Sequence, residues 1–105
     1  MNSVFKALAD PTRRKVLELL RQRPMTAGEL SAQFPVSRPT MSAHFAVLRE
    51  ADLIESTKIG TTITYQLKLS VLEDALLGFA QLFGLGTAAE SAPPRKPVPT
   101  KGPAQ

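Results

Sequence analysis

The stretch TAGELSAQFPVSRPTMSAHFAVLREA, residues 26–51, decides the fold of this protein. It opens with Thr26, followed three residues later by Glu29, which is the pattern of a capping box at a helix N-terminus. We expect the short helix that begins there to extend to about Gln33 and to bury Leu30.

A tight turn follows, because the proline in Phe34-Pro35-Val36 restricts the residue before it and the first helix cannot continue. Ser37 is placed to cap a second, longer helix that runs to about Ala51. Two helices joined by a turn of three or four residues form the helix-turn-helix unit, whose second helix enters the major groove of DNA. The apolar residues of the second helix recur at i, i+4 and i+7 and predict a buried stripe of Met41, Phe45 and Leu48.

The other side of this second helix has the chemistry of a DNA-reading surface. If the stripe faces the core, helix geometry turns these residues outward or sideways: Pro39, Thr40, Ser42, Ala43 and Ala46. This face is small and polar and has no acidic residue before Glu50. A helix enters a groove about 12 Å wide only with short side chains on that face. Arg38, in the first turn, can pair with a phosphate or read a guanine. The alternative is a solvated surface whose serines and threonines act only as caps.

A β-hairpin is predicted directly after the second helix, over Leu53–Lys58 and Thr62–Lys68. Both segments are rich in β-branched residues, and Gly60 is the turn candidate between them. A hairpin in this position is a wing. Lys58 and Thr61 flank its tip, where contact with DNA phosphates and simple exposure to solvent are equally compatible with the sequence.

His44 is the one histidine of the chain and lies toward the edge of the buried stripe. Its spacing leaves two interpretations open: it contacts a phosphate or a base, or it packs between the helix and the hairpin. A zinc ligand is not expected, because no second histidine and no cysteine accompanies it. The predicted DNA-binding residues are Ser37, Arg38, Pro39, Thr40, Ser42, Ala43, His44, Lys58 and Thr61.

Two helices are expected before the helix-turn-helix unit and one after the hairpin. The first covers Ser3–Ala9, and the second covers Pro11–Gln22 with Asp10 as its cap. The last helix is expected to begin at a second capping box formed by Ser70 and Glu73. The predicted fold class is therefore mainly α with a small β-hairpin, a winged helix-turn-helix.

The last helix carries more apolar side chains than a domain of this size needs internally. We interpret the excess as a homodimer interface through the first and last helices, because a twofold pair places two recognition helices about one DNA turn apart. Packing within the core of one chain is the alternative. The predicted interface residues are Val4, Phe5, Leu8, Leu72, Leu76, Phe79, Leu82 and Phe83.

The winged helix-turn-helix is predicted to occupy residues 1–86, and residues 87–105 to form a disordered, proline-rich tail. The net charge is +4, but residues 1–86 contain ten basic and eight acidic residues, whereas the tail contains three and one. Half of the excess charge therefore lies in the tail. The case for DNA binding rests on the motif and not on net charge.

Composition excludes several function classes. The chain contains no cysteine, which removes disulfides, thiolate ligands and thiol redox sensing. No apolar run approaches the ~20 residues that cross a bilayer, and the N-terminus does not resemble a signal peptide, so a cytoplasmic protein is expected. Ser42 and His44 do not face each other on a helix, and neither do Glu73 and Asp74. No enzymatic activity, cofactor or metal is expected.

Three motifs resemble, in this order, the ArsR family of winged-helix repressors: Asp10-Pro11-Thr12-Arg13-Arg14, Thr26-Ala27-Gly28-Glu29-Leu30, and SRPTMSAHF at residues 37–45. The resemblance covers about residues 1–83 and is strongest to the SdpR-like autorepressor subgroup. It implies a homodimer, joined by its first and last helices, that binds an inverted repeat in its operator. It also implies that the residues on or beside the DNA-reading helix include Ser37, Arg38, Pro39, Thr40, Ser42 and His44.

The chain departs from the family pattern in two places. Metal-sensing members carry cysteines in the helix at residues 29–34, or aspartate and histidine ligands in the last helix, and neither set is present here, so metal sensing is not expected. Many relatives have arginines in the wing, where this chain has Lys58-Ile59-Gly60-Thr61-Thr62. The subgroup also implies a membrane-associated partner that sequesters the repressor, although no segment can be assigned to it.

The sequence is therefore compatible with two functions. The first is a sequence-specific repressor that binds double-stranded DNA as a homodimer. The alternative is a winged-helix module that binds a protein through its last helix and tail and has little intrinsic DNA specificity.

Overall fold

The structure is a computed structural model of the chain that describes residues 2–85. The predicted tail, residues 87–105, and the predicted domain boundary at residue 86 lie outside the described residues. The chain divides into two units, residues 1–72 and residues 73–105, which we describe separately.

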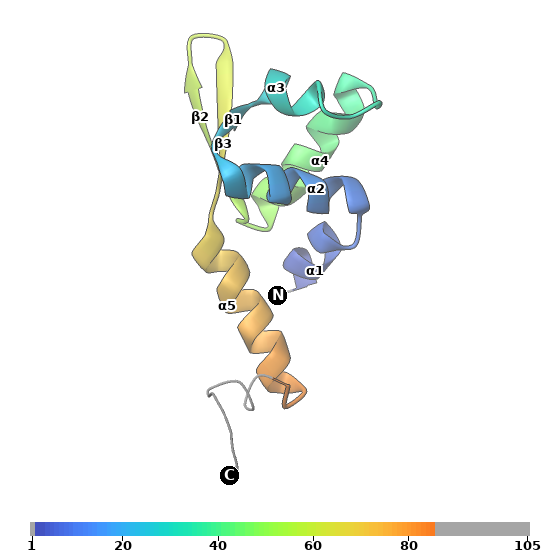
Figure 1. Cartoon of the computed structure of the whole chain (residues 1–105), viewed down its shortest axis with the longest axis vertical. Helices are drawn as coiled ribbons and strands as arrows, with labels where there is room; N and C mark the ends of the chain where they lie inside the picture. The colour runs from blue at the N-terminus through green and yellow to red at the C-terminus, as the bar shows by residue number, and fades with distance from the viewer. Residues whose placement is uncertain (1, 86–105) are drawn as a thin grey trace, which may run out of the picture. The chain divides into compact units, whose positions relative to one another are not determined.

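The fold is mainly helical with a small antiparallel sheet, as predicted (Figure 1). The last helix, α5, begins at the end of the first unit and continues in the second. The elements are α1 (Asn2–Leu8), α2 (Pro11–Gln22), β1 (Met25–Thr26), α3 (Ala27–Ser31), α4 (Arg38–Glu50), β2 (Ile54–Ile59), β3 (Thr62–Leu67) and α5 (Leu69–Leu82).

Side-chain caps set where three of the helices begin, as the sequence predicts. Thr26 and Glu29 form both hydrogen bonds of the capping box of α3, at 3.0 Å and 2.9 Å. Asp10 caps α2 and Ser37 caps α4, each by accepting the backbone N–H of the third residue on, at 3.1 Å and 3.3 Å. Each cap satisfies a backbone donor that has no partner within the helix, which stabilises the helix by about 1 kcal/mol.

The predicted stripe of α4 forms the centre of the core. Met41, Phe45 and Leu48 have exposed fractions of 0%, 3% and 0%. They pack with buried residues of the other elements of the first unit, and each large side chain contributes about 1.5–3 kcal/mol by leaving water. The other large apolar side chains buried in this unit are Val4, Val16, Leu17, Leu20, Met25, Leu30, Leu53, Ile54 and Tyr65.

The sheet has a third strand, β1, that the sequence pattern does not predict. Strand order is β1-β3-β2, and β1 pairs with β3 antiparallel in the register Met25↔Tyr65 and Thr26↔Thr64. A strand of two residues is too short to show the alternating pattern of a strand. Its pairing joins the start of α3 to the centre of the wing.

The hairpin turn has the glycine that its geometry requires. Ile59 and Thr62 are the last paired residues of β2 and β3, so Gly60 and Thr61 form a two-residue turn. Gly60 has φ +62. A positive φ at the first turn position is characteristic of hairpin turns whose twist matches that of the strands.

Two predicted helix ends are wrong. The helix α3 ends at Ser31, two residues before the predicted Gln33. The capping box predicted at Ser70 and Glu73 does not form, because α5 begins at Leu69 and Ser70 already lies in its first turn. The chain is held before that point, since the backbone N–H of Lys68 donates to the carbonyl of Leu53 at 2.8 Å.

The helix α4 ends in a left-handed residue that directs the chain into the wing. Asp52 has φ +61, and its N–H donates to the carbonyl of Arg49 at 2.9 Å. The N–H of Leu53 donates to the carbonyl of Leu48 at 3.1 Å. These two bonds form a Schellman motif, in which glycine is the usual left-handed residue.

Candidate nucleic-acid interface

The outer face of α4 is exposed over its first two turns. Arg38, Pro39, Thr40, Ser42 and Ala43 are exposed, whereas the stripe on the opposite side is buried. The predicted orientation of the helix is therefore confirmed, although orientation alone does not test contact with DNA. The short side chains of Thr40, Ser42 and Ala43 leave the helix backbone free to approach base edges in a groove about 12 Å wide.

The Ser37 cap also orients a side chain of this face. The Ser37 hydroxyl accepts the backbone N–H of Thr40 and donates its own hydrogen to Thr40 Oγ1, at 2.9 Å. Because Thr40 Oγ1 accepts this bond, its own hydrogen points away from Ser37 and is available to an external acceptor. Ser37 therefore acts as a cap, and Thr40 presents an oriented donor.

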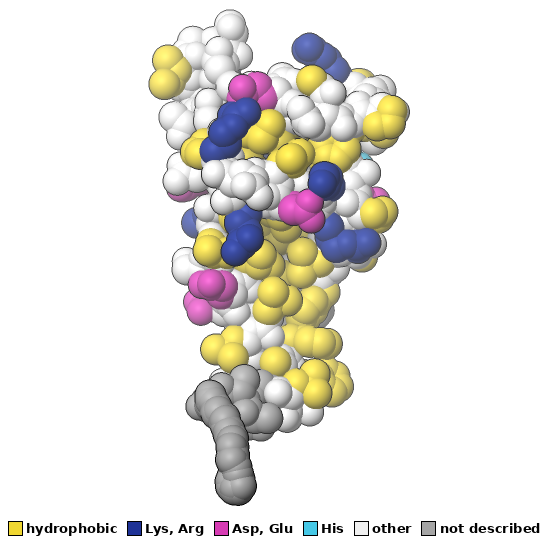
Figure 2. Space-filling view, in the orientation of Figure 1, with side chains coloured by type: hydrophobic (Ala, Val, Ile, Leu, Met, Phe, Trp, Pro, Cys, Tyr) yellow, Lys and Arg dark blue, Asp and Glu magenta, His cyan; other side chains and the backbone are white. Residues whose placement is uncertain are grey.

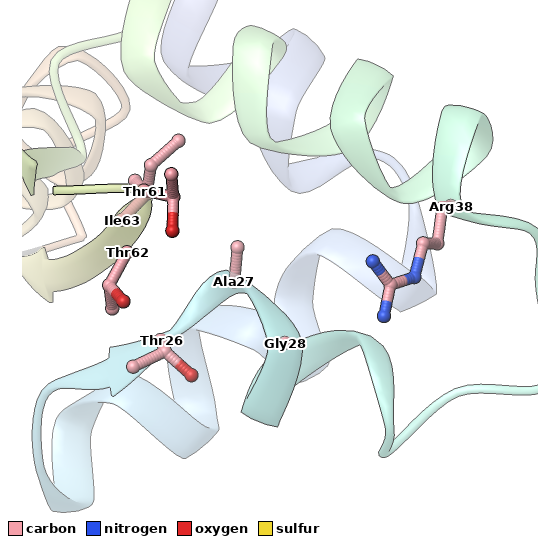
Figure 3. Close-up of a pocket in the computed structure, with 7 residues that line it drawn as sticks. All are labelled: Thr26, Ala27, Gly28, Arg38, Thr61, Thr62 and Ile63. Carbon is pink, nitrogen blue, oxygen red and sulfur yellow. The ribbon is translucent and has the colours of Figure 1, made fainter.

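An open pocket of about 300 Å³ lies between the first turn of α4, the start of α3 and the wing (Figure 3). The guanidinium of Arg38 extends into it from α4. Among residues 2–85, this guanidinium has no hydrogen-bond or ion-pair partner, so its donors are available to an external anion. The residues that line the pocket are Thr26, Ala27, Gly28, Arg38, Thr61, Thr62 and Ile63.

The tip of the wing is exposed and carries one cation. Lys58 and Thr61, both predicted to contact DNA, are exposed. Ile59, beside the turn, is 76% exposed.

Cations do not gather in one patch on the visible face of the first unit. Figure 2 shows Lys and Arg side chains spread among acidic and apolar ones. Two described cations lie near the exposed face of α4: Arg38 in its first turn and Lys58 near the wing tip.

Comparison with known proteins assigns the family. Residues 8–57 match the sequence model of a family described as a helix-turn-helix domain. The chain is 45% identical over 76 residues to the transcriptional repressor SdpR of Bacillus subtilis (strain 168), which covers 72% of this chain and 84% of SdpR. It is 32% identical over 76 residues to the arsenical resistance operon repressor of Staphylococcus aureus, over 72% and 73% of the two chains.

A solved structure supports the same family assignment. The crystal structure of an ArsR family transcriptional regulator superposes with a TM-score of 0.74 at 32% identity, over 87% of this chain and 97% of that chain. The chain belongs to the ArsR family. Members of this family are DNA-binding transcription regulators, which are not a class of enzymes.

In this ArsR-family chain, His44 packs against the residues at the start of α2. Its side chain is 14% exposed, and its Nδ1 lies 3.2 Å from Nη1 of Arg13. Its Nε2 lies 3.9 Å from Oδ2 of Asp10. Because these partners belong to the beginning of α2, the packing of His44 against the hairpin is wrong. Contact between His44 and DNA stays a prediction.

Arg13, which the sequence pattern does not assign to any site, holds the end of α1. Its Nε donates to the carbonyl of Ala7 and its Nη2 to that of Lys6, both at 2.8 Å. Arg14 donates to the carbonyl of Leu8 at 2.7 Å. These carbonyls belong to the last turn of α1, where the regular hydrogen bonds of the helix end; the Lys6 carbonyl also accepts the backbone N–H of Ala9 at 3.3 Å. The sequence signal that could have identified Arg13 and Arg14 is a pair of adjacent arginines soon after the end of the first helix.

Asp10 carries a negative charge at the junction between α1 and α2. The hydrogen bond from the backbone N–H of Arg13 holds the pKa of Asp10 below its ordinary value of 3.8, and the nearby charge of Arg13 adds to this effect against the opposing effect of burial. Asp10 is therefore ionised at neutral pH.

The predicted dimer residues fall into two groups. Val4 is 5% exposed and packs inside one chain, and Phe5, Leu8 and Leu72 are half-buried. Most of the large apolar side chains of α5 are exposed, and Figure 2 shows mainly hydrophobic surface over this helix. Leu77 and Leu85, which the prediction omitted, extend this surface. The exposed fractions are 45% for Leu76, 52% for Leu77, 38% for Phe79, 76% for Leu82, 62% for Phe83 and 66% for Leu85.

Within residues 2–85, no three His, Cys, Asp or Glu side chains are grouped so that they could hold a metal ion. In the same part of the chain, no helix has the length and apolar character needed to span a membrane.

Proposed function

We propose that this protein is a transcriptional repressor that binds an inverted-repeat operator in double-stranded DNA as a homodimer. The observation that carries the proposal is the exposed face of α4 beside a pocket into which Arg38 extends without a partner. The relatives named as repressors support the same function.

The exposed face of α4 supplies the contacts to bases. The Thr40 hydroxyl donates to a base edge or a phosphate, and its methyl group packs against a thymine methyl. Ser42 adds a second hydroxyl one half-turn further along. Ala43 keeps the approach unobstructed, because it is exposed and short.

The pocket supplies a place for the DNA backbone. When α4 lies in the major groove and the wing lies along the adjacent minor groove, the strand between the two grooves passes between them. The Arg38 guanidinium and the hydroxyls of Thr61 and Thr62 line that space and bind a phosphate of this strand. Lys58 adds a second phosphate contact near the wing tip.

The exposed apolar surface of α5 supports dimerisation, because a contiguous patch of this kind on a small domain usually marks an interface. In the proposal a second copy covers this surface, and α1 contributes Phe5 and Leu8. The twofold pair then presents two copies of α4 to half-sites about 34 Å apart. A repressor of this kind acts in the cytoplasm. The membrane-associated partner is not part of the proposal, because neither the relatives nor the described residues support it.

Fluorescence anisotropy with labelled duplexes tests the proposal. DNA from upstream of the protein's own gene is titrated with protein at several salt concentrations, beside a duplex of scrambled sequence. The protein is expected to prefer the upstream DNA. Arg38→Ala and Ser42→Ala are expected to weaken binding about tenfold or more, in line with about 1–3 kcal/mol for a base or phosphate contact.

The matched control is Lys15→Ala, which removes one charge from an exposed position on α2, where Lys15 pairs with Glu18 at 2.7 Å. It is expected to bind like the unmodified protein. Equally weak binding to both duplexes would contradict the proposal and favour the protein-interaction module.

A further inference from the structure

We propose that Arg13 is a positioning residue for DNA binding: its hydrogen bond to His44 sets the rotation of α4 on the α1–α2 junction, and this bond exists only while His44 is neutral. The inference rests on the proposed function, because the helix so positioned is the one that reads DNA.

The guanidinium of Arg13 joins three elements. Two of its nitrogens hold the carbonyls of Lys6 and Ala7 at the end of α1, at 2.8 Å each, and the third faces Nδ1 of His44 at 3.2 Å. Its own backbone N–H is held by the Asp10 cap at 3.1 Å. The direction of the Arg13 guanidinium is therefore fixed independently of α4, because a planar guanidinium with two bonds to fixed carbonyls has little rotational freedom.

Apart from the approach of Asp10 Oδ2 to His44 Nε2 at 3.9 Å, the described side-chain contacts that hold α4 on its inner side are apolar. Met41, Phe45 and Leu48 are buried, and burial of apolar surface stabilises the position of a helix without a preferred direction. A hydrogen bond weakens steeply when its angle departs from linear, so the Arg13–His44 bond is sensitive to rotation. At a helix radius of about 5 Å, a rotation of about 20° moves an outer side chain by about 2 Å. That displacement is enough to break hydrogen bonds from Thr40 and Ser42 to base edges.

The chemistry of the bond requires neutral histidine. Arginine can only donate, so Nδ1 of His44 must accept and carry no proton, and the ring hydrogen lies on Nε2. The charged groups that face the ring are Arg13 and Asp10 from the start of α2. From α1, Lys6 meets this cluster through its carbonyl, and its side chain is exposed.

Protonation of Nδ1 removes the acceptor and places a second positive charge 3.2 Å from Arg13. The attraction of Asp10 for the imidazolium is weaker than this repulsion, because Asp10 lies further away, at 3.9 Å, and its Oδ2 already accepts the Arg13 N–H. With a side chain only 14% exposed, the ring cannot turn to water without displacing α4. DNA binding should therefore weaken when acid protonates the ring.

Three forms of the full chain test this inference by anisotropy at pH 8 and pH 6: the unmodified protein, His44→Leu and His44→Asn. His44 is the only histidine of the chain, so either substitution removes the only imidazole. The unmodified protein is expected to lose about tenfold in affinity between pH 8 and pH 6, which corresponds to one hydrogen bond to a charged group. His44→Leu, without the acceptor, is expected to bind about tenfold more weakly at pH 8 and to show no such loss on acidification.

His44→Asn is the rescue variant, because the Asn carbonyl accepts from Arg13 and does not titrate. It is expected to restore most of the affinity that His44→Leu loses and to bind equally at both pH values. Melting temperatures distinguish positioning from unfolding, and all three proteins are expected to remain folded at 25 °C.

Equal affinity of the unmodified protein at both pH values, or full affinity of His44→Leu at pH 8, would overturn the inference while leaving the proposed function intact. A failure of the unmodified protein to prefer upstream DNA at pH 8 would refute the proposed function itself. The ¹⁵N shifts of the His44 ring give a check without DNA: an unprotonated Nδ1 at pH 8 supports the inference, and a protonated Nδ1 contradicts it.

Discussion

The rings of Phe45 and Tyr65 lie with their centroids 4.7 Å apart and are tilted by 37°, and this contact joins α4 to the central strand β3. Both side chains are buried, at 3% and 6% exposure. The recognition helix and the wing therefore share one packed contact, so a change in the position of one element is transmitted to the other.

We expect Phe45→Leu to lower the free energy of unfolding by about 1–2 kcal/mol, because it removes the ring pairing and leaves a small void. Urea denaturation followed by circular dichroism measures this change. Ile59→Leu, on an exposed residue of β2, is the control and should shift stability by less than about 0.5 kcal/mol. An equal effect of the two substitutions would show that the ring contact does not stabilise the fold.

Lys58→Ala should weaken binding to all DNA sequences alike, because Lys58 is proposed to contact a phosphate and not a base. The slope of the logarithm of the binding constant against the logarithm of salt concentration should fall by about 1 per half-site. Thr40→Ala, in contrast, should change the preference among sequences and leave the slope unchanged. A slope that Lys58→Ala does not alter means that the wing lysine is simply exposed to solvent.

Asp52 occupies a left-handed position, with φ +61, and Lys68 Nζ lies 2.8 Å from its carboxylate. Asp52→Ala should lower the free energy of unfolding by about 1 kcal/mol, because alanine is disfavoured there and cannot pair with Lys68. Asp52→Gly loses the same ion pair but removes the backbone strain, so it should be more stable than Asp52→Ala by about 1 kcal/mol. Thermal unfolding of the two variants side by side measures this difference, and the reverse order would contradict the role of the backbone.

The carboxyl group of Asp10 makes the free energy of unfolding depend on pH. The pKa of its carboxyl is lowered in the folded protein, so its stabilising effect is complete well above pH 3.8 and is lost as the pH falls below that value. Asp10→Asn keeps a good helix cap but cannot be protonated. We expect it to lose less stability than the unmodified protein between pH 5 and pH 2.5 in urea titrations. Asp74→Asn, which removes the same charge from an exposed site on α5, is the control. If Asp10→Asn and the unmodified protein lost the same stability on acidification, the stabilising role of the Asp10 charge would be ruled out.

Leu82→Glu should disrupt the proposed dimer, because it places a charge on the exposed apolar surface of α5, where Leu82 is 76% exposed. Light scattering after size exclusion should report the mass of one chain, 11.4 kDa, while helix content is retained. Gln81→Glu adds the same charge at the neighbouring exposed polar position and should remain dimeric. A Leu82→Glu protein that still dimerises would require a different interface.

Local interactions made much of the fold predictable from the sequence. The caps at Asp10, Thr26 and Ser37 join residues three positions apart, and the stripe from Met41 to Leu48 follows from helix geometry. The exposed face of α4 was predictable for the same reason, because burying one side of a helix exposes the other.

The remaining features depend on residues far apart in the chain. Arg13 and His44 are separated by 31 positions, and the pocket brings Arg38 together with Gly28 and Thr62. No periodic pattern predicts such contacts, since each depends on how whole helices pack. The false capping box at Ser70 has the same cause, because a backbone bond from Lys68 to Leu53 set the start of α5. The sequence by itself determined the helices, the wing and the family of this protein. Only the tertiary structure decided what Arg13, His44 and Arg38 face, because long-range packing places their side chains.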